Sequence, residues 1–321
     1  MTPIGGPRAT SLRLGRPRDW LVGAVLLGGV LLGVALTVGW DKLLAPWRDL
    51  SVPELLPLLF LSALSYGLRA VRVYDYFRPR LRGRFPTVLR LSVLHNSANN
   101  LLPMRAGEMV FPWLMGRYFS HGFLDATAAL VWIRLLDLHS LGLIGMLTLW
   151  LRSSSWIWPL AATAWLALLP LAYKGRLAMP AGEGGRVRRL LRRALEAAPA
   201  SFGRVLRMYL WTTLTWASKF AAFAVLLHHF LPVGLWLVLT GVMGAELSSV
   251  LPVHGIAGSG SYELAVVAAL VPFGVSPQAA LAGAVNLHLF LLGVTLLLGG
   301  MAFLLPVQRP PVELAKPIND G

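Results

Sequence analysis

The sequence contains no cysteine among its 321 residues. Disulfides, thiolate catalysis and cysteine-ligated metal sites are therefore excluded. Its seven histidines never occur at the His-x-x-x-His spacing of a helical zinc site, and no Gly-x-Ser-x-Gly elbow is present. We therefore expect no metal, no cofactor and no catalytic constellation, and predict that the protein is not an enzyme.

Charged residues are also scarce. They make up 13% of the chain, against about 25% in a typical soluble domain, while 56% of residues are hydrophobic and the mean hydropathy is +0.65. The apolar residues form long unbroken runs, which excludes the alternating strands of an outer-membrane barrel. The sequence therefore predicts an all-α integral membrane protein.

Acidic residues are the scarcer charged class, with 14 Asp and Glu against 29 Lys and Arg, a net charge of +15. Such a balance could indicate a nucleic-acid partner. However, the cations cluster at the ends of apolar runs and in the loops between them, and no soluble segment is large enough to form a basic groove. We therefore expect membrane topology signals and no nucleic acid.

Six apolar runs are long enough to cross a bilayer at about 20 residues per crossing. They cover 20–40, 51–74, 123–151, 156–173, 208–231 and 276–305. Two further apolar stretches, 88–119 and 235–273, are interrupted at 103–108 and 252–261, so that each piece is short. Short pieces of this kind predict two re-entrant, broken-helix hairpins. Ordinary proline kinks in long packed helices are the alternative.

The distribution of Lys and Arg predicts the orientation. The segments 1–19, 78–90 and 174–207 are basic and should be cytoplasmic, whereas 41–50 and 152–155 carry little net charge and should lie outside. Both termini, including the polar tail 306–321, would then face the cytoplasm of a bacterial-type inner membrane. The loop 174–207 could bind anionic inner-leaflet lipids, or serve only as a topology determinant.

The two halves of the membrane part have the same order of elements. Residues 20–151 and residues 152–305 each read helix, helix, broken hairpin, helix, and the second half begins on the opposite side. Broken segments at matching positions of an inverted-topology repeat indicate a binding site near the bilayer midplane. The two interruptions should therefore face each other there.

Polar residues in and beside the interruptions are the candidate substrate-binding set. They are Arg105, Glu108, Asn99, Asn100, His254, Gly258, Ser259, Gly260, Ser261 and Glu263. A guanidinium fork matches phosphate oxygens, glycine-flanked amides at a helix start favour anions, and intramembrane carboxylates could gate or couple to protons. The alternatives are structural: an Arg105–Glu108 pair that shapes the turn, capping carboxylates, a hairpin tip, and asparagines that bond a neighbouring helix.

Three arginines lie in predicted spanning helices. Arg134 and Asp137 are three residues apart on one helix face, so we expect a buried ion pair, structural rather than a proton relay. Arg69 and Arg72 lie near the end of the second helix, from where they should extend to the membrane surface.

Four groups of residues carry a family resemblance: Leu68 to Arg72, Asn99 to Glu108, Arg134 with Asp137, and Leu251 to Glu263. Together they resemble the flippase-like transmembrane domain of lysylphosphatidylglycerol synthases, over about residues 60–305, including stand-alone relatives of the hopanoid-associated type. The resemblance implies a lipid translocase or lipid-handling domain without the aminoacyl-transferase part. Ile133 and His288 depart from the family pattern, which often has an acidic residue and an arginine at these places.

The leading hypothesis is a flippase-like transporter that handles a polar or anionic lipid headgroup at a midplane site between the hairpins. The lipid could be a phospholipid, an isoprenoid-linked lipid or a hopanoid-type lipid, and the chain could form a homo-oligomer. The alternatives are a membrane-embedded enzyme that modifies lipids, and a non-catalytic membrane partner of a lipid-synthesis complex that docks through 174–207.

Overall fold

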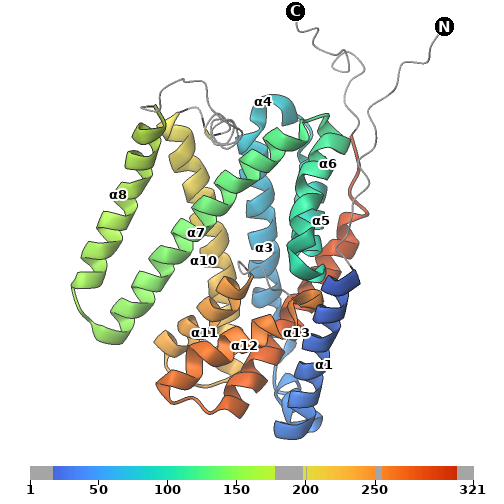
Figure 1. Cartoon of the computed structure of the whole chain (residues 1–321), viewed down its shortest axis with the longest axis vertical. Helices are drawn as coiled ribbons and strands as arrows, with labels where there is room; N and C mark the ends of the chain where they lie inside the picture. Colours follow the sequence, from blue (N-terminus) through green and yellow to red (C-terminus); the bar gives the residue numbers. More distant parts are fainter. Residues whose placement is uncertain (1–16, 178–197, 200, 250–254, 309–321) are drawn as a thin grey trace, which may run out of the picture.

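Long helices running along one axis make up most of the molecule, with shorter helices between them (Figure 1). A computed structural model describes residues 17–177, 198–199, 201–249 and 255–308. Within these ranges the chain is helical and contains no strand, so the all-α prediction is confirmed. The segment 186–193, a basic stretch of the loop 174–207, lies outside the described residues.

The long helices are α1 (Pro17–Thr37), α3 (Val52–Tyr76), α7 (Phe123–Ser153), α8 (Ile157–Leu177), α10 (Phe202–Phe230) and α13 (Pro277–Ala302). Short helices α2 (Trp40–Leu44), η1 (Ala45–Trp47) and α4 (Arg78–Leu81) connect them. The first broken unit consists of α5 (Phe85–Leu101), η2 (Pro103–Met109) and α6 (Val110–Phe119). The second consists of α11 (Leu235–Ser248), η3 (Ile256–Gly258), α12 (Ser261–Leu270) and η4 (Val271–Phe273).

Six helical segments of the described chain are long and apolar enough to cross a membrane, which establishes a multi-pass membrane protein. Five of them coincide with predicted spanning helices. The predicted helix 156–173 is present, but its apolar part is the shorter Ile157–Leu171. The sixth segment is Ile256–Phe273 instead, because η3, α12 and η4 follow one another almost without interruption.

The two broken units lie at opposite ends of the helical axis (Figure 1). The α5–α6 pair occupies the upper part of the view and the α11–α12 pair the lower part, and their interruptions η2 and η3 are in contact. The turns depend on left-handed backbone at Met104 (φ 50°), Arg105 (φ 55°) and Ala257 (φ 53°). This backbone is uncommon outside glycine, so tertiary packing must hold it in place.

Close packing fixes the position of the first interruption. A Cβ on Gly107 would collide with the backbone of Ala98 and Asn99, so η2 lies directly against the end of α5. Around this contact, two apolar clusters fill the interior, one centred on α10, α11, α12 and α13 and the other on α5, α6 and α7. Both clusters include residues of α3, which therefore connects the two broken units.

Candidate functional site

A cavity of about 460 Å³ lies where the two interruptions meet the long helices. Its lining comes from α3, α5, η2, α6, α7, α10, α11, η3, α12 and α13, so every part of the two broken units except η4 contributes to it. The cationic lining residues are Arg69, Arg105, Arg134 and Lys219, and the carboxylates are Glu108, Asp137 and Glu246. Charge at this density inside an apolar helical protein is costly and is typical of a functional site.

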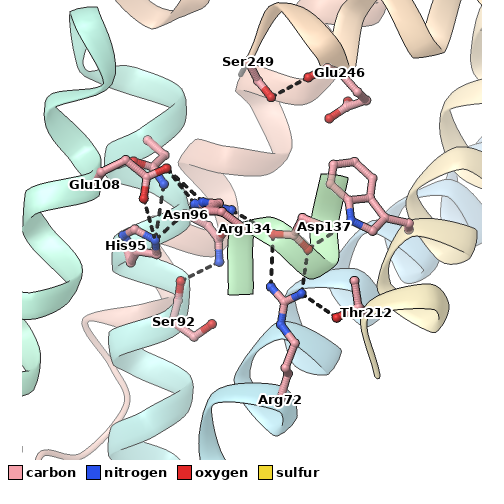
Figure 2. Close-up of polar contacts among 12 residues, drawn as sticks. Arg72, Ser92, His95, Asn96, Glu108, Arg134, Asp137, Thr212, Glu246 and Ser249 are labelled. Atoms are coloured by element: carbon pink, nitrogen blue, oxygen red, sulfur yellow. Dashed lines mark hydrogen bonds and ion pairs between the residues drawn. The ribbon is translucent and has the colours of Figure 1, made fainter. Parts of the chain in front are cut away.

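Glu108 is held by two arginines. Its Oε1 accepts from Arg105 Nη2 at 2.7 Å and from Arg134 Nε at 3.0 Å. Figure 2 shows Arg134 extending from α7 between Glu108 and Asp137. The structure therefore contains the Arg105–Glu108 pair that was the structural alternative, and adds a bridge from η2 to α7.

Asp137 is the most heavily bonded carboxylate of the site. It accepts from Arg72 Nη1 at 2.6 Å, from Arg134 Nη1 at 3.1 Å and from Trp216 Nε1 at 3.0 Å (Figure 2). Arg72 also donates to Thr212 Oγ1 at 2.9 Å. The Arg134–Asp137 ion pair is thus part of a larger network that joins α3, α7 and α10.

Arg69 lines the cavity one helical turn before Arg72, and it is bonded quite differently. Arg69 is 9% exposed, and its guanidinium lies 5.2 Å from the ring centroid of Trp216. No carboxylate of the described residues forms an ion pair with it. The expectation that Arg69 and Arg72 extend to the membrane surface is wrong, because both side chains are buried against α7 and α10.

Lys219 of α10 and Glu246 of α11 form a further charged pair in the lining. Lys219 Nζ donates to Glu246 Oε2 at 2.6 Å and lies over the rings of Trp216 and Phe223. Glu246 Oε1 has no hydrogen-bond partner among the described residues, and the same holds for the hydroxyls of Ser62 and Tyr262, two further lining residues. Within the described part of the chain, the lining therefore contains one cation without an ion pair, Arg69, and several polar atoms without a hydrogen-bond partner.

Three asparagines of α5 lie at the cavity, and one of them also bonds neighbouring helices. Asn96, Asn99 and Asn100 line the cavity. Asn100 also donates to Tyr66 Oη at 3.1 Å and to Thr295 Oγ1 at 2.8 Å, which ties α5 to α3 and α13.

The glycine-rich segment of the second interruption is bonded within itself. The amides of Gly258 and Ser259 donate to the carbonyls of Gly255 and Ile256, and the amide of Gly260 donates to Glu263 Oε2 at 2.7 Å. Ser261 Oγ donates to Gly258 O at 3.1 Å. These amides are therefore engaged in this conformation, although Gly258 itself lines the cavity. His254 lies outside the described residues.

Lys219 and Glu246 were not predicted as site residues, although the position of each in the sequence indicates one. Both are charged residues within long apolar runs, at 202–230 and 235–248. That is the pattern of an intramembrane functional residue. Within the described residues, no group of three or more His, Asp and Glu side chains is placed to hold a metal ion.

The cavity has an apolar rim on η2 and α7. Met109, Val131, Leu135 and Leu138 all line it, and each is about half exposed, at 48%, 47%, 50% and 48%. These half-exposed lining residues place the mouth of the cavity beside η2 and α7, and α7 is long and apolar enough to cross a membrane.

These features define a multi-pass membrane protein with a charged cavity between its helices. The family described as the lysylphosphatidylglycerol synthase TM region matches residues 20–299. The chain belongs to this family, as its resemblance had indicated, and its function is related to membrane lipids. The comparison with curated proteins and the comparison with solved structures each found no match.

Proposed function

We propose that the protein translocates a lipid with an anionic, phosphate-bearing headgroup across a bacterial-type inner membrane. The observation that carries the proposal is Arg69, a buried cation that lines the cavity with no carboxylate partner among the described residues. A buried charge without a counterion is expensive. A bound phosphate would supply that counterion, and the planar fork of an arginine matches phosphate oxygens.

The remaining charges of the cavity support a polar ligand of this sign. Glu108 and Asp137 are each already neutralised by two arginines. Lys219 and Glu246 neutralise each other. Arg69 is thus the lining cation that forms no ion pair among the described residues. The hydroxyls of Ser62 and Tyr262 have no hydrogen-bond partner there and could donate to the other oxygens of a headgroup.

The apolar rim explains how a lipid could use the cavity. The headgroup would pass between Met109 and the exposed face of α7 while the acyl or isoprenoid tail stays in the bilayer. Only the headgroup then needs a polar path, since the tail never leaves an apolar environment. Leu135 lies at the centre of this rim.

The placement of the two broken units suggests how access could alternate. We interpret α5–α6 and α11–α12 as re-entrant hairpins that enter from opposite sides of the membrane, with η2 and η3 meeting near the midplane (Figure 1). In an inverted repeat, rocking of one half on the other opens the central site to each side in turn. Both termini would face the cytoplasm, as the positive-inside pattern predicts.

Headgroup movement in proteoliposomes tests this function. Fluorescent phospholipids with anionic, zwitterionic and uncharged headgroups are compared, and an impermeant quencher added outside reports lipid that reaches the outer leaflet. The wild type should move the anionic lipid faster than empty liposomes do. Arg69→Gln should reduce that rate at least about tenfold, because a hydrogen bond to a charged group contributes about 1.5–3 kcal/mol.

Arg152→Gln is the matched control. Arg152 is exposed near the end of α7 and stacks on Trp236 and Phe273, outside the cavity lining. This variant should move lipid like the wild type. Wild-type rates equal to those of empty liposomes for every lipid would refute translocation, and equal rates for the two variants would refute the role of Arg69.

A further inference from the structure

One buried histidine of α13 forms hydrogen bonds to the second interruption and to the helix that follows it. His288 Nδ1 lies 2.6 Å from Glu263 Oε1, and His288 Nε2 lies 2.8 Å from the carbonyl oxygen of Ala257. His288 and Glu263 are each 3% exposed. The histidine therefore joins α13 to α12 and to η3 at once.

The partners of this histidine determine how many protons the pair carries. A carbonyl oxygen can only accept, so Nε2 must bear a hydrogen. If Glu263 is ionised, Nδ1 must bear a second hydrogen. If Nδ1 bears none, the hydrogen between the two groups must belong to the Glu263 carboxyl. In both cases the pair holds one proton more than a neutral imidazole beside a carboxylate.

The carboxylates of the cavity lining differ in whether a partner can release a proton. Glu246 is paired with Lys219, whose ammonium can release one. Glu108 and Asp137 are paired with arginines, which do not release a proton in proteins. Glu263 forms no ion pair with Arg or Lys among the described residues; its partners are His288 and the amide of Gly260.

Several titratable groups lie near the pair. Tyr262 of α12 stacks on the imidazole with ring centroids 4.4 Å apart. The titratable groups that neighbouring elements bring to the cavity are Tyr66 and Arg69 of α3, Arg105 and Glu108 of η2, Arg134 and Asp137 of α7, Lys219 of α10 and Glu246 of α11. His95 of α5 bonds to the first interruption at Gly107, and none of these groups bonds to Glu263 or His288 in the described structure.

We propose that Glu263 and His288 form a proton-binding site whose occupancy controls the conformation of the second interruption. When the proton leaves for water, the imidazole keeps one N–H and can donate to Glu263 or to Ala257, but not to both. An ionised carboxylate is a stronger acceptor than a carbonyl, so the remaining N–H goes to Glu263 and the Ala257 carbonyl loses its donor. Ala257 already holds the left-handed backbone that alanine disfavours. The η3 turn is released from α13.

The proton site borders the proposed headgroup site. Ala257, Gly258, Tyr262 and His288 all line the cavity, so release of η3 would change the wall against which a headgroup lies. A proton would then be the second ligand of the cavity. The inference goes beyond the proposed lipid function, and its test requires no lipid movement.

Cysteine labelling at Ser259 tests the proposal directly, because the chain has no cysteine of its own. Ser259 directly follows η3 and is 6% exposed. The cysteine of the Ser259→Cys protein should therefore react slowly with N-ethylmaleimide while His288 is bonded to the Ala257 carbonyl. Purified protein is labelled from about pH 5 to about pH 9, the range that brackets ordinary histidine titration. The Ser155→Cys protein, whose cysteine is in an exposed loop, corrects for the rise of thiolate with pH.

We expect the corrected labelling of Ser259→Cys to rise at least about fivefold with increasing pH, since a buried hydrogen bond is lost. In the His288→Gln and Glu263→Gln backgrounds the corrected rate should not depend on pH. A pH-independent rate in the wild-type background refutes the proton site, even if neither variant folds. The same pH dependence in a folded variant also refutes it. Because no lipid is transported, failure of the proposed translocation would leave this result unaffected.

Discussion

Arg72 of α3 and Asp137 of α7 lie 2.6 Å apart in the interior, where the two residues are 2% and 4% exposed. Thr212 accepts from the arginine and Trp216 donates to the aspartate, both from α10. Three long helices are therefore held together by one buried charged cluster directly beside the cavity. Such a cluster need not add net stability, but removing one member leaves an uncompensated buried charge.

Asp137→Ala should therefore lower the free energy of unfolding by about 3–5 kcal/mol, the range for breaking a buried ion pair. Asp75→Ala is the control, because Asp75 pairs with Arg207 at the same 2.6 Å distance but with the arginine side chain 44% exposed. That change should cost less than about 1 kcal/mol. Denaturant unfolding of both variants in detergent makes the comparison, and equal losses would contradict the role of the cluster.

The rim of the cavity gives a second prediction. Leu135 lines the cavity and is 50% exposed, so Leu135→Trp should narrow the opening and slow headgroup movement severalfold. Leu147→Trp makes the same change on the same helix at a residue that is 46% exposed and outside the lining. Lipid movement in proteoliposomes should fall only for the first variant. If both variants move lipid equally fast, the opening is elsewhere.

A pH effect is expected at the end of the first broken unit, outside the long helices. Burial and the neighbouring Arg80 both lower the pKa of His121, whose Nδ1 accepts from Arg80 Nη1 at 2.6 Å. The imidazole of His121 therefore takes up a proton more readily in the unfolded chain than in the folded protein. The stability that depends on a neutral His121 is fully present above about pH 6.5, the ordinary histidine pKa. It declines as pH falls below that value, because protonation favours the unfolded chain.

His121→Asn should remove this part of the pH dependence, because an asparagine does not titrate. Thermal unfolding at about pH 7.5 and about pH 5, either side of the ordinary histidine range, should show a smaller decrease for the variant than for the wild type. An identical decrease in both proteins would mean that His121 does not titrate on unfolding.

The helices could be predicted from the sequence because apolar runs and prolines report directly on local structure. Pro103 marks the first interruption, and charge placement indicated that Arg134 and Asp137 would pair. The surroundings of the Arg69 and Arg72 side chains could not be predicted from the sequence in this way. A charged residue near a helix end can reach the surface or pack against another helix, and only the tertiary contacts with Asp137 and Trp216 decide between them.

The second interruption shows a different limit. Its glycines suggested free amides for an anion, but the same amides can bond locally, and here Gly260 donates to Glu263. The contact between His288 and Ala257 spans 31 residues and depends on how α13 packs on α12. A pairing of this kind has no local signal in one sequence, so it emerges only from the structure.

Photocrosslinking tests most directly the central claim that an anionic headgroup lies in the cavity beside Arg69. A phosphatidylglycerol with a photoreactive headgroup is incorporated with the protein into liposomes, irradiated, and the modified peptides are identified. The account predicts crosslinks on the cavity-lining segments of α3, α5 and α10, lost with excess unlabelled lipid and in Arg69→Gln but retained in Arg152→Gln. Crosslinks confined to the outer surface, or unchanged in Arg69→Gln, would contradict it.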